Sequence, residues 1–216
     1  MNTTDSQRLG SSVPTELVLL DWKRRIFDLY ARIRAHGEPR HAWDEWRAAR
    51  DELFRSHDQS PLSPEARPGF AGAAYFDYDP EARVLARLEG ASPEPLEIAT
   101  SQGTTYRFTR FALARFEYGG AEEALQVYWL DGYGGGVFLP FGDATNGSAT
   151  YGGGRYLLDT VKGADLGMLG DELVLDFNFA YNPSCAYDPN WVCPLAPPEN
   201  RLARPIEAGE RVLQNA

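Results

Sequence analysis

Residues 133–158 read YGGGVFLPFGDATNGSATYGGGRYLL and contain the sequence Tyr-Gly-Gly-Gly twice, at 133–136 and at 151–154. An apolar run with an aromatic residue follows each copy, which predicts two strands, 137–141 and 155–158. Because glycine loses more conformational freedom on folding than any other residue, these glycines indicate a tight turn, a bulge or a close approach to the backbone. The stretch therefore predicts a β-hairpin with a site beside it.

Further strand signals lie on both sides of this hairpin. Short apolar segments bounded by Gly, Pro or Asp predict strands over residues 84–88, 96–100, 105–111, 124–130 and 173–177. Short strands at this spacing are typical of an antiparallel sheet.

Helical periodicity covers the N-terminal part of the chain. Apolar residues recur every three or four positions from Leu19 to Ile33, which predicts an amphipathic helix over residues 14–35. Gly37 is a natural end for this helix, and a second helix is expected over residues 39–55.

The C-terminal part has a different composition. Residues 178–205 contain six prolines, which exclude a long helix or a central strand. They also contain four aromatic residues, too many for a solvated linker. We expect a long ordered loop, a strap across the body of the protein.

These patterns predict one α+β domain over residues 14–216, preceded by a disordered N-terminal arm over residues 1–13. In this domain a helical hairpin (14–56) packs on a bent antiparallel β-sheet (74–177) that is barrel-like or sandwich-like. The strap (178–205) covers one opening of the sheet.

Composition narrows the class of partner. The 216 residues carry a net charge of −10, which disfavours binding to nucleic acid or to anionic membranes. No apolar run reaches the roughly 18 residues of a membrane-spanning helix, and the N-terminus lacks the pattern of a secretory signal. We therefore expect a cytoplasmic protein whose two cysteines, Cys185 and Cys193, are reduced thiols.

Four segments together resemble a known family. They are residues 133–141, 150–157, 175–178 and 181–187. This combination resembles the uncharacterised prokaryotic family catalogued as domain of unknown function 1684, over residues from about 20 to 210. The resemblance implies a single soluble domain and no catalytic residue.

The glycine-rich hairpin suggests an anion site. Backbone N–H groups of a glycine-rich turn can bind an anion, and a guanidinium such as that of Arg155 would complete the site. Lys162 lies just beyond, and Arg47 and Arg50 of the second helix could add charge. The alternative is structural, with Arg155 paired to Asp143 or Asp159.

Polar and aromatic residues extend this hypothesis. We expect Tyr156, Asn178 and Asn182 to orient the ligand, and Tyr133 and Tyr151 to line a pocket for a flat molecule. The resulting hypothesis is a small anionic metabolite held between the glycine-rich hairpin and the strap. The sequence identifies no cofactor and no oligomeric state.

Two other classes of function remain open. Cys185 as nucleophile and His57 as base would make a thiol-dependent hydrolase or transferase, with Asn178, Asn182 or Asp176 as the third member. The spacing of the two cysteines lies outside usual zinc motifs, so we expect no metal site. The remaining alternative is a structural or partner-binding module in which the aromatic residues form the core.

Overall fold

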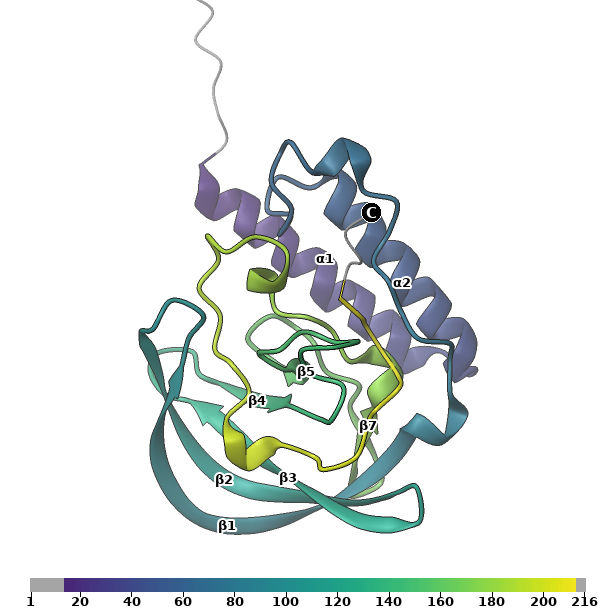
Figure 1. The fold of residues 1–216 in the computed structure, drawn as a ribbon, viewed down its shortest axis with the longest axis vertical. Coiled ribbons are helices and arrows are strands. Elements are labelled where there is room, and N and C mark those ends of the chain that lie inside the picture. Colours follow the sequence, from purple (N-terminus) through teal and green to yellow (C-terminus); the bar gives the residue numbers. More distant parts are fainter. Residues whose placement is uncertain (1–13, 213–216) are drawn as a thin grey trace, which may run out of the picture.

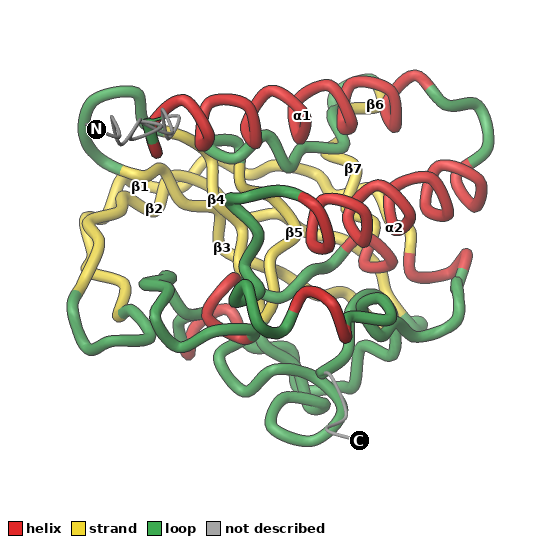
Figure 2. Tube along the Cα trace, turned by 90° about the horizontal axis from the view of Figure 1, so that it is seen from above, coloured by secondary structure: helices red, strands yellow, loops and turns green. Residues whose placement is uncertain are grey.

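The two predicted helices form a hairpin on one side of the molecule (Figures 1 and 2). The computed structural model describes residues 14–212, so the arm predicted over residues 1–13 lies outside it. Helix α1 is Thr15–Ala35 and α2 is Pro39–Ser56, where proline suits the first turn because its missing N–H has no partner there. Within the described residues, no helix is long and apolar enough to cross a membrane.

One antiparallel sheet forms the rest of the body. Its strands are β1 (Arg83–Ala99), β2 (Thr105–Tyr118), β3 (Ala121–Leu130), β4 (Gly136–Phe141), β5 (Arg155–Asp159), β6 (Met168–Leu169) and β7 (Glu172–Asp176). Their order is β5-β4-β3-β2-β1-β7-β6. The α+β class is therefore confirmed, but the sheet is open rather than a closed barrel. Within residues 14–212, short 3-10 helices cover 67–69, 80–82, 177–179, 184–186 and 198–200.

The strands predicted over 84–88 and 96–100 are parts of one strand, β1. Gly90 and the prolines after it indicated a break. In the structure they lie at a bulge, where the pairing with β2 shifts register between Gly90 and Glu94 and the strand continues. A bulge bends a strand and increases its twist, so these residues curve the sheet instead of ending the strand.

Two hydrophobic clusters lie on opposite faces of β4 and β5. Phe138 and Tyr156 belong to the cluster that includes the helices, whereas their neighbours Leu139 and Leu157 belong to the other cluster. This alternation follows from the two-residue period of a strand. The hairpin α1–α2 therefore covers one face of the sheet near β4 and β5.

In the stretch that was predicted to form the glycine-rich hairpin, β4 pairs antiparallel with β5. Gly154 shows why glycine is needed here. Its φ is +88°, and a Cβ at this position would lie 2.7 Å from the carbonyl oxygen of Phe141. The chain thus turns tightly into β5 while packed against the end of β4.

The C-terminal segment, residues 180–212, runs across the body without a long regular element (Figure 1). The side chain of Asn200 pairs with both backbone groups of Gln126 in β3, at 2.7 and 2.9 Å. Backbone hydrogen bonds join Gly142, which follows β4, to Asn200 and Leu202. This segment therefore fastens the β4–β5 region to the rest of the protein.

Candidate functional site

Arg155 is fully buried and bound to internal groups. Its Nη2 donates to Asp143 Oδ2 and to the carbonyl of Ile206, both at 3.0 Å. Its Nη1 donates to the carbonyls of Ala208 and Glu210. Burial lowers the pKa of Arg155, and Asp143 opposes that effect. The structural alternative, pairing with Asp143, is therefore confirmed, and the assignment of Arg155 as a ligand cation is wrong.

Three other predicted ligand residues also lie away from any common pocket. Asn178 holds the backbone of Asp79, accepting from its N–H at 2.9 Å and donating to its carbonyl at 2.7 Å. Arg47 stacks 3.8 Å above the ring of Trp43. Tyr133 is fully exposed in the turn before β4. Their residue types were suitable, but the fold does not bring them together.

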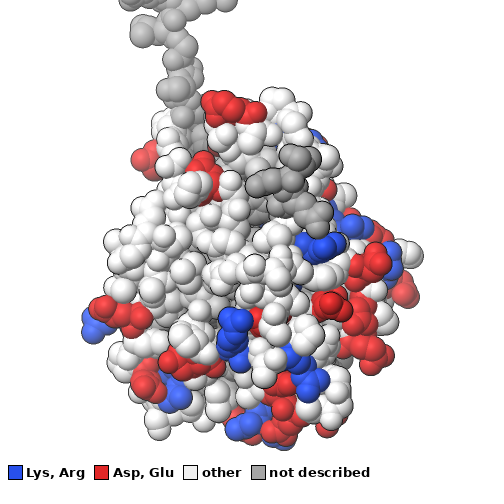
Figure 3. Space-filling model, in the orientation of Figure 1, with Lys and Arg blue, Asp and Glu red and all other residues white. Residues whose placement is uncertain are grey.

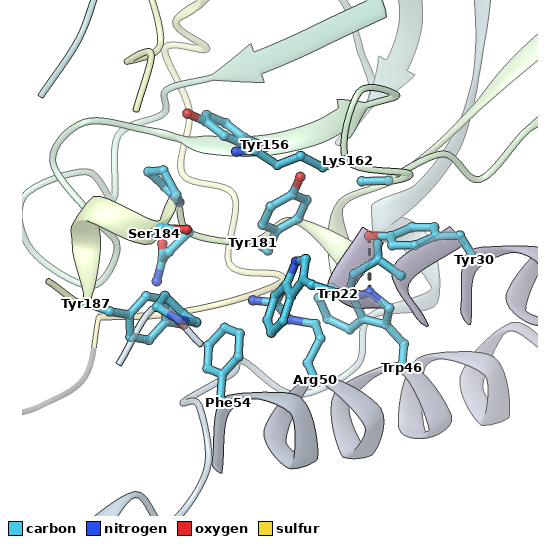
Figure 4. Close-up of a pocket in the computed structure, with 15 residues that line it drawn as sticks. Trp22, Tyr30, Trp46, Arg50, Phe54, Tyr156, Lys162, Tyr181, Ser184 and Tyr187 are labelled. Atoms are coloured by element: carbon cyan, nitrogen blue, oxygen red, sulfur yellow. Dashed lines mark hydrogen bonds between the residues drawn. The ribbon is translucent and has the colours of Figure 1, made fainter. Parts of the chain in front are cut away.

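A cavity does lie between the helical hairpin and the first part of the C-terminal segment (Figure 4). It offers about 60 Å³ to the centres of water molecules, several times the roughly 10–15 Å³ that one water needs. Its walls come from the helices (Trp22, Ile26, Tyr30, Trp46, Arg50, Phe54), from the strand β5 region (Tyr156, Lys162, Ala164), and from the loops (Pro61, Tyr181, Asn182, Pro183, Ser184, Tyr187).

Aromatic rings surround the guanidinium of Arg50 in this cavity. Its Cζ lies 4.8 Å from the ring centroid of Trp46, 4.9 Å from that of Phe54 and 5.0 Å from that of Tyr181. Its Nη2 donates to Glu210 Oε2 at 2.9 Å. Burial raises the pKa of Glu210 to about 7, although Arg50 acts in the opposite direction. Arg50 is thus a buried cation with a partner of opposite charge.

Lys162 is the other cation of the cavity and the more accessible one. Its side chain is 46% exposed, and Nζ lies 3.5 Å from Asp159 Oδ2. Nζ also lies 5.8 Å from the ring centroid of Tyr156. The same lysine lines a second, more open hollow beside Phe108 and Phe138. Lys162 therefore lies beside a pocket, as was expected from the sequence.

Tyr156 and Asn182, both predicted as ligand-orienting residues, line the cavity with Lys162. Tyr156 donates its hydroxyl to the carbonyl of Pro194, and Asn182 Nδ2 donates to the carbonyl of Arg211 at 2.9 Å. Asn182 Oδ1 and the hydroxyl of Tyr187 have no hydrogen-bond partner within the described residues. Buried polar groups are normally paired, so these two atoms mark this wall as incompletely satisfied.

Apart from Arg50, which was expected to add charge, the residues on the helical side of the cavity were not identified from the sequence as part of a site. Trp22, Tyr30, Trp46 and Phe54 fit the apolar periodicity of two amphipathic helices, which does not separate core positions from cavity walls. The sequence feature that pointed to this side of the cavity is Arg50, a charged residue on the apolar side of α2. A buried arginine between aromatic residues needs a partner, and here Glu210 provides it.

Cys185 and His57 do not form the predicted nucleophile–base pair. His57 Nε2 lies 3.0 Å from Asp21 Oδ2, and His57 Nδ1 accepts from the backbone N–H of Gln59 at 3.0 Å. Both ring nitrogens are therefore engaged elsewhere. The sulfur of Cys185 instead lies 3.5 Å from the hydroxyl of Tyr151. Tyr151 thus contacts the thiol instead of lining the cavity.

Comparison with known proteins identifies the family. The model of the family described as protein of unknown function (DUF1684) matches residues 68–211. The chain belongs to this family. The match includes the sheet and most of the C-terminal segment but begins after the helical hairpin, later than the residue near 20 at which the resemblance was expected to start.

A solved structure is similar to this chain in sequence and in fold. The chain is 39% identical to an uncharacterized protein of Haloarcula marismortui whose solution NMR structure superposes with a TM-score of 0.56. The alignment covers 78% of this chain and 91% of the archaeal one. No curated protein matches the sequence.

Proposed function

We propose that this DUF1684 protein binds a small anionic metabolite in the cavity between the helical hairpin and residues 181–187. The observation that carries the proposal is the composition of the walls. Trp22, Trp46 and Tyr181 contribute aromatic surface from three parts of the chain, and only a few polar side chains accompany them. Binding sites for small molecules commonly combine apolar walls with a few placed polar groups.

The two cations of the cavity have different roles in this proposal. Arg50 already donates a hydrogen bond to Glu210, so its guanidinium has a partner inside the protein. Lys162 is half-exposed and pairs with Asp159 at 3.5 Å, a weaker contact that an incoming anion can share. The ligand class that we propose is a small, partly apolar molecule with one anionic group, whose charge meets Lys162 and whose apolar part contacts the aromatic side chains.

A ligand panel tests this assignment. Aromatic carboxylates and phosphates, each paired with its uncharged amide or alcohol, are titrated while tryptophan fluorescence is recorded, since Trp22 and Trp46 line the cavity. We expect an acid to bind more tightly than its neutral analogue. Lys162→Met should weaken that acid at least about tenfold, which corresponds to roughly 1.4 kcal/mol.

Lys23→Met is the matched control, because Lys23 is the other lysine of the chain and lies on α1 outside the cavity lining. It should leave the affinity unchanged. Equal effects of the two substitutions would show that only general charge matters. A flat response to the whole panel would contradict the proposal and favour a structural or partner-binding module.

A further inference from the structure

Tyr181 lies near the start of the C-terminal segment, beside β5. Its backbone pairs with that of Tyr156 in an antiparallel bridge, with N–O distances of 2.9 and 3.1 Å. The rings of the two tyrosines meet edge-on at 5.6 Å between centroids, and the guanidinium of Arg50 lies 5.0 Å from the Tyr181 ring. These contacts fix the Tyr181 side chain, which is only 9% exposed, on the wall of the cavity.

The hydroxyl of Tyr181 differs from that of its neighbour Tyr156, which donates to the carbonyl of Pro194. Within residues 14–212 the Tyr181 hydroxyl makes no hydrogen bond, and it is not among the polar atoms that the protein seals from solvent. Figure 4 shows it extending into the cavity toward Lys162. Because buried polar groups are normally paired, this hydroxyl is available to a ligand.

Lys162 supplies a second hydrogen-bond donor on the same side of the cavity. Its backbone N–H donates to the carbonyl of Asp159 at 3.1 Å, so both side chains leave one turn after β5. Nζ lies 3.5 Å from Asp159 Oδ2 and 5.8 Å from the ring centroid of Tyr156, the ring that also contacts Tyr181. Burial raises the pKa of Tyr181 well above its usual range, so its hydroxyl keeps the proton that it donates.

These two donors suit a carboxylate better than a phosphate. A carboxylate offers one oxygen to each donor and carries a single negative charge. Asp159 already shares the charge of Lys162, and the other cation of the cavity, Arg50, donates to Glu210 at 2.9 Å. Among the described residues no third cation lines the cavity. A phosphate dianion would bring its second charge close to Asp159, and the repulsion would weaken its binding.

The size of the cavity limits the rest of the ligand. Its 60 Å³ for the centres of water molecules corresponds to about four to six waters at roughly 10–15 Å³ each. Apolar side chains, among them Trp22, Ile26 and Phe54, line the remaining walls. A carboxylate with a short chain or a single ring therefore matches both the volume and the walls of the cavity.

We infer that the ligand of the cavity is a small monocarboxylate, whose two oxygens accept hydrogen bonds from Lys162 Nζ and from the Tyr181 hydroxyl. The inference rests on the proposed function and narrows it from small anionic molecules in general to this one class. It also makes Tyr181 a binding residue through its hydroxyl, in addition to the aromatic surface that its ring provides.

Isothermal titration calorimetry of the full-length protein tests the class of anion. Benzoate and butyrate, a ring and a short chain, are each compared with the corresponding amide and with phenyl phosphate or butyl phosphate, at about pH 8 where the phosphates are dianions. At least one of the acids should bind about tenfold or more tightly than both its amide and its phosphate. Tighter binding of the phosphates would overturn the inference and leave the proposed function intact.

Tyr181→Phe tests the hydroxyl itself. The change keeps the ring and removes a hydroxyl without a protein partner, so the unfolding temperature of the free protein should stay the same. The affinity for the acid should fall about tenfold or more, and by a larger factor than the affinity for the amide, because hydrogen bonds to charged groups are the stronger ones. Tyr187→Phe is the matched control, since Tyr187 lines the same cavity but its hydroxyl is sealed within the protein. It should leave both affinities unchanged.

The outcomes separate this inference from the proposed function. If an acid binds and Lys162→Met weakens it but Tyr181→Phe does not, the inference is wrong and the proposed function stands. If none of the acids or phosphates binds, both are wrong. Should Tyr181→Phe fail to fold, the comparison of acids, amides and phosphates in the wild-type protein still decides the class of ligand.

Discussion

Substitution of Arg155 by methionine removes the central donor between the hairpin loop and the C-terminal segment. The change keeps a long apolar stem and deletes a guanidinium that contacts Asp143 and the carbonyls of Ile206, Ala208 and Glu210. Because Arg155 holds internal groups together, Arg155→Met should lower the free energy of unfolding of the protein even when no ligand is present.

The structure sets the size of this loss. Removal of one partner from a buried ion pair costs about 3–5 kcal/mol, because the other charge stays buried. Asp143 retains part of its support, since Oδ1 accepts from the N–H and the hydroxyl of Thr145 at 2.7 and 2.6 Å. Three carbonyls lose a charged donor, but water can enter as the segment loosens. We expect about 4 kcal/mol, a large part of the roughly 5–15 kcal/mol that stabilises a typical domain.

Urea denaturation followed by circular dichroism measures this difference. The control is Arg87→Met, which breaks an exposed pair with Glu89 whose side chains are 67% and 40% exposed. That control should cost no more than about 1 kcal/mol. Asp143→Asn combined with Arg155→Met should cost much less than the sum of the single changes, because both act on one interaction.

Three results would refute this reasoning. One is a loss for Arg155→Met no larger than that for Arg87→Met, and another is additivity in the double variant. The third is a stability difference that high salt abolishes, since screening acts mainly on exposed charges.

Two further predictions concern buried polar groups of the cavity region. Burial raises the pKa of Glu210 from 4.5 to about 7, so between these values the folded state binds a proton that the unfolded chain has released. The free energy of unfolding should therefore fall as pH rises through this window. Glu210→Gln should remove up to about 3 kcal/mol of that pH dependence, as measured by urea titrations at several pH values. An unchanged pH dependence in the variant would contradict the raised pKa of Glu210. Tyr156→Phe removes a hydrogen bond to the carbonyl of Pro194 and should cost about 1 kcal/mol, whereas Tyr187→Phe removes a hydroxyl without a partner and should be nearly neutral. Thermal unfolding of the two variants side by side checks the difference, and equal losses would be inconsistent with it.

The local elements of this protein could be predicted from sequence with good accuracy. The periodicity around Leu29 and Ile33 gave the first helix, and the two glycine runs gave the β4–β5 hairpin. Prolines were harder to interpret, because β1 continues through Pro93 and Pro95 where a break was expected. A bulge can accommodate such residues, and whether one forms depends on the strand alongside.

The residues of the candidate site could be predicted from the sequence only in part. Lys162, Tyr156 and Asn182 were identified by residue type and do line the cavity. Arg155 was assigned the wrong role, because its partners at Ala208 and Glu210 lie 53 and 55 positions further along the chain. The thiol of Cys185 was paired with His57, whereas Asp21 holds that histidine.

The sequence by itself therefore determined the helices, most of the strands and the hairpin, because these depend on side-chain spacing between near neighbours. Only the tertiary structure decided which polar groups meet. A buried arginine can serve a ligand or a carboxylate with the same donors, and the choice depends on which distant backbone folds over it. In this protein the C-terminal segment folds over Arg155, and the cavity opens instead beside Arg50 and Lys162.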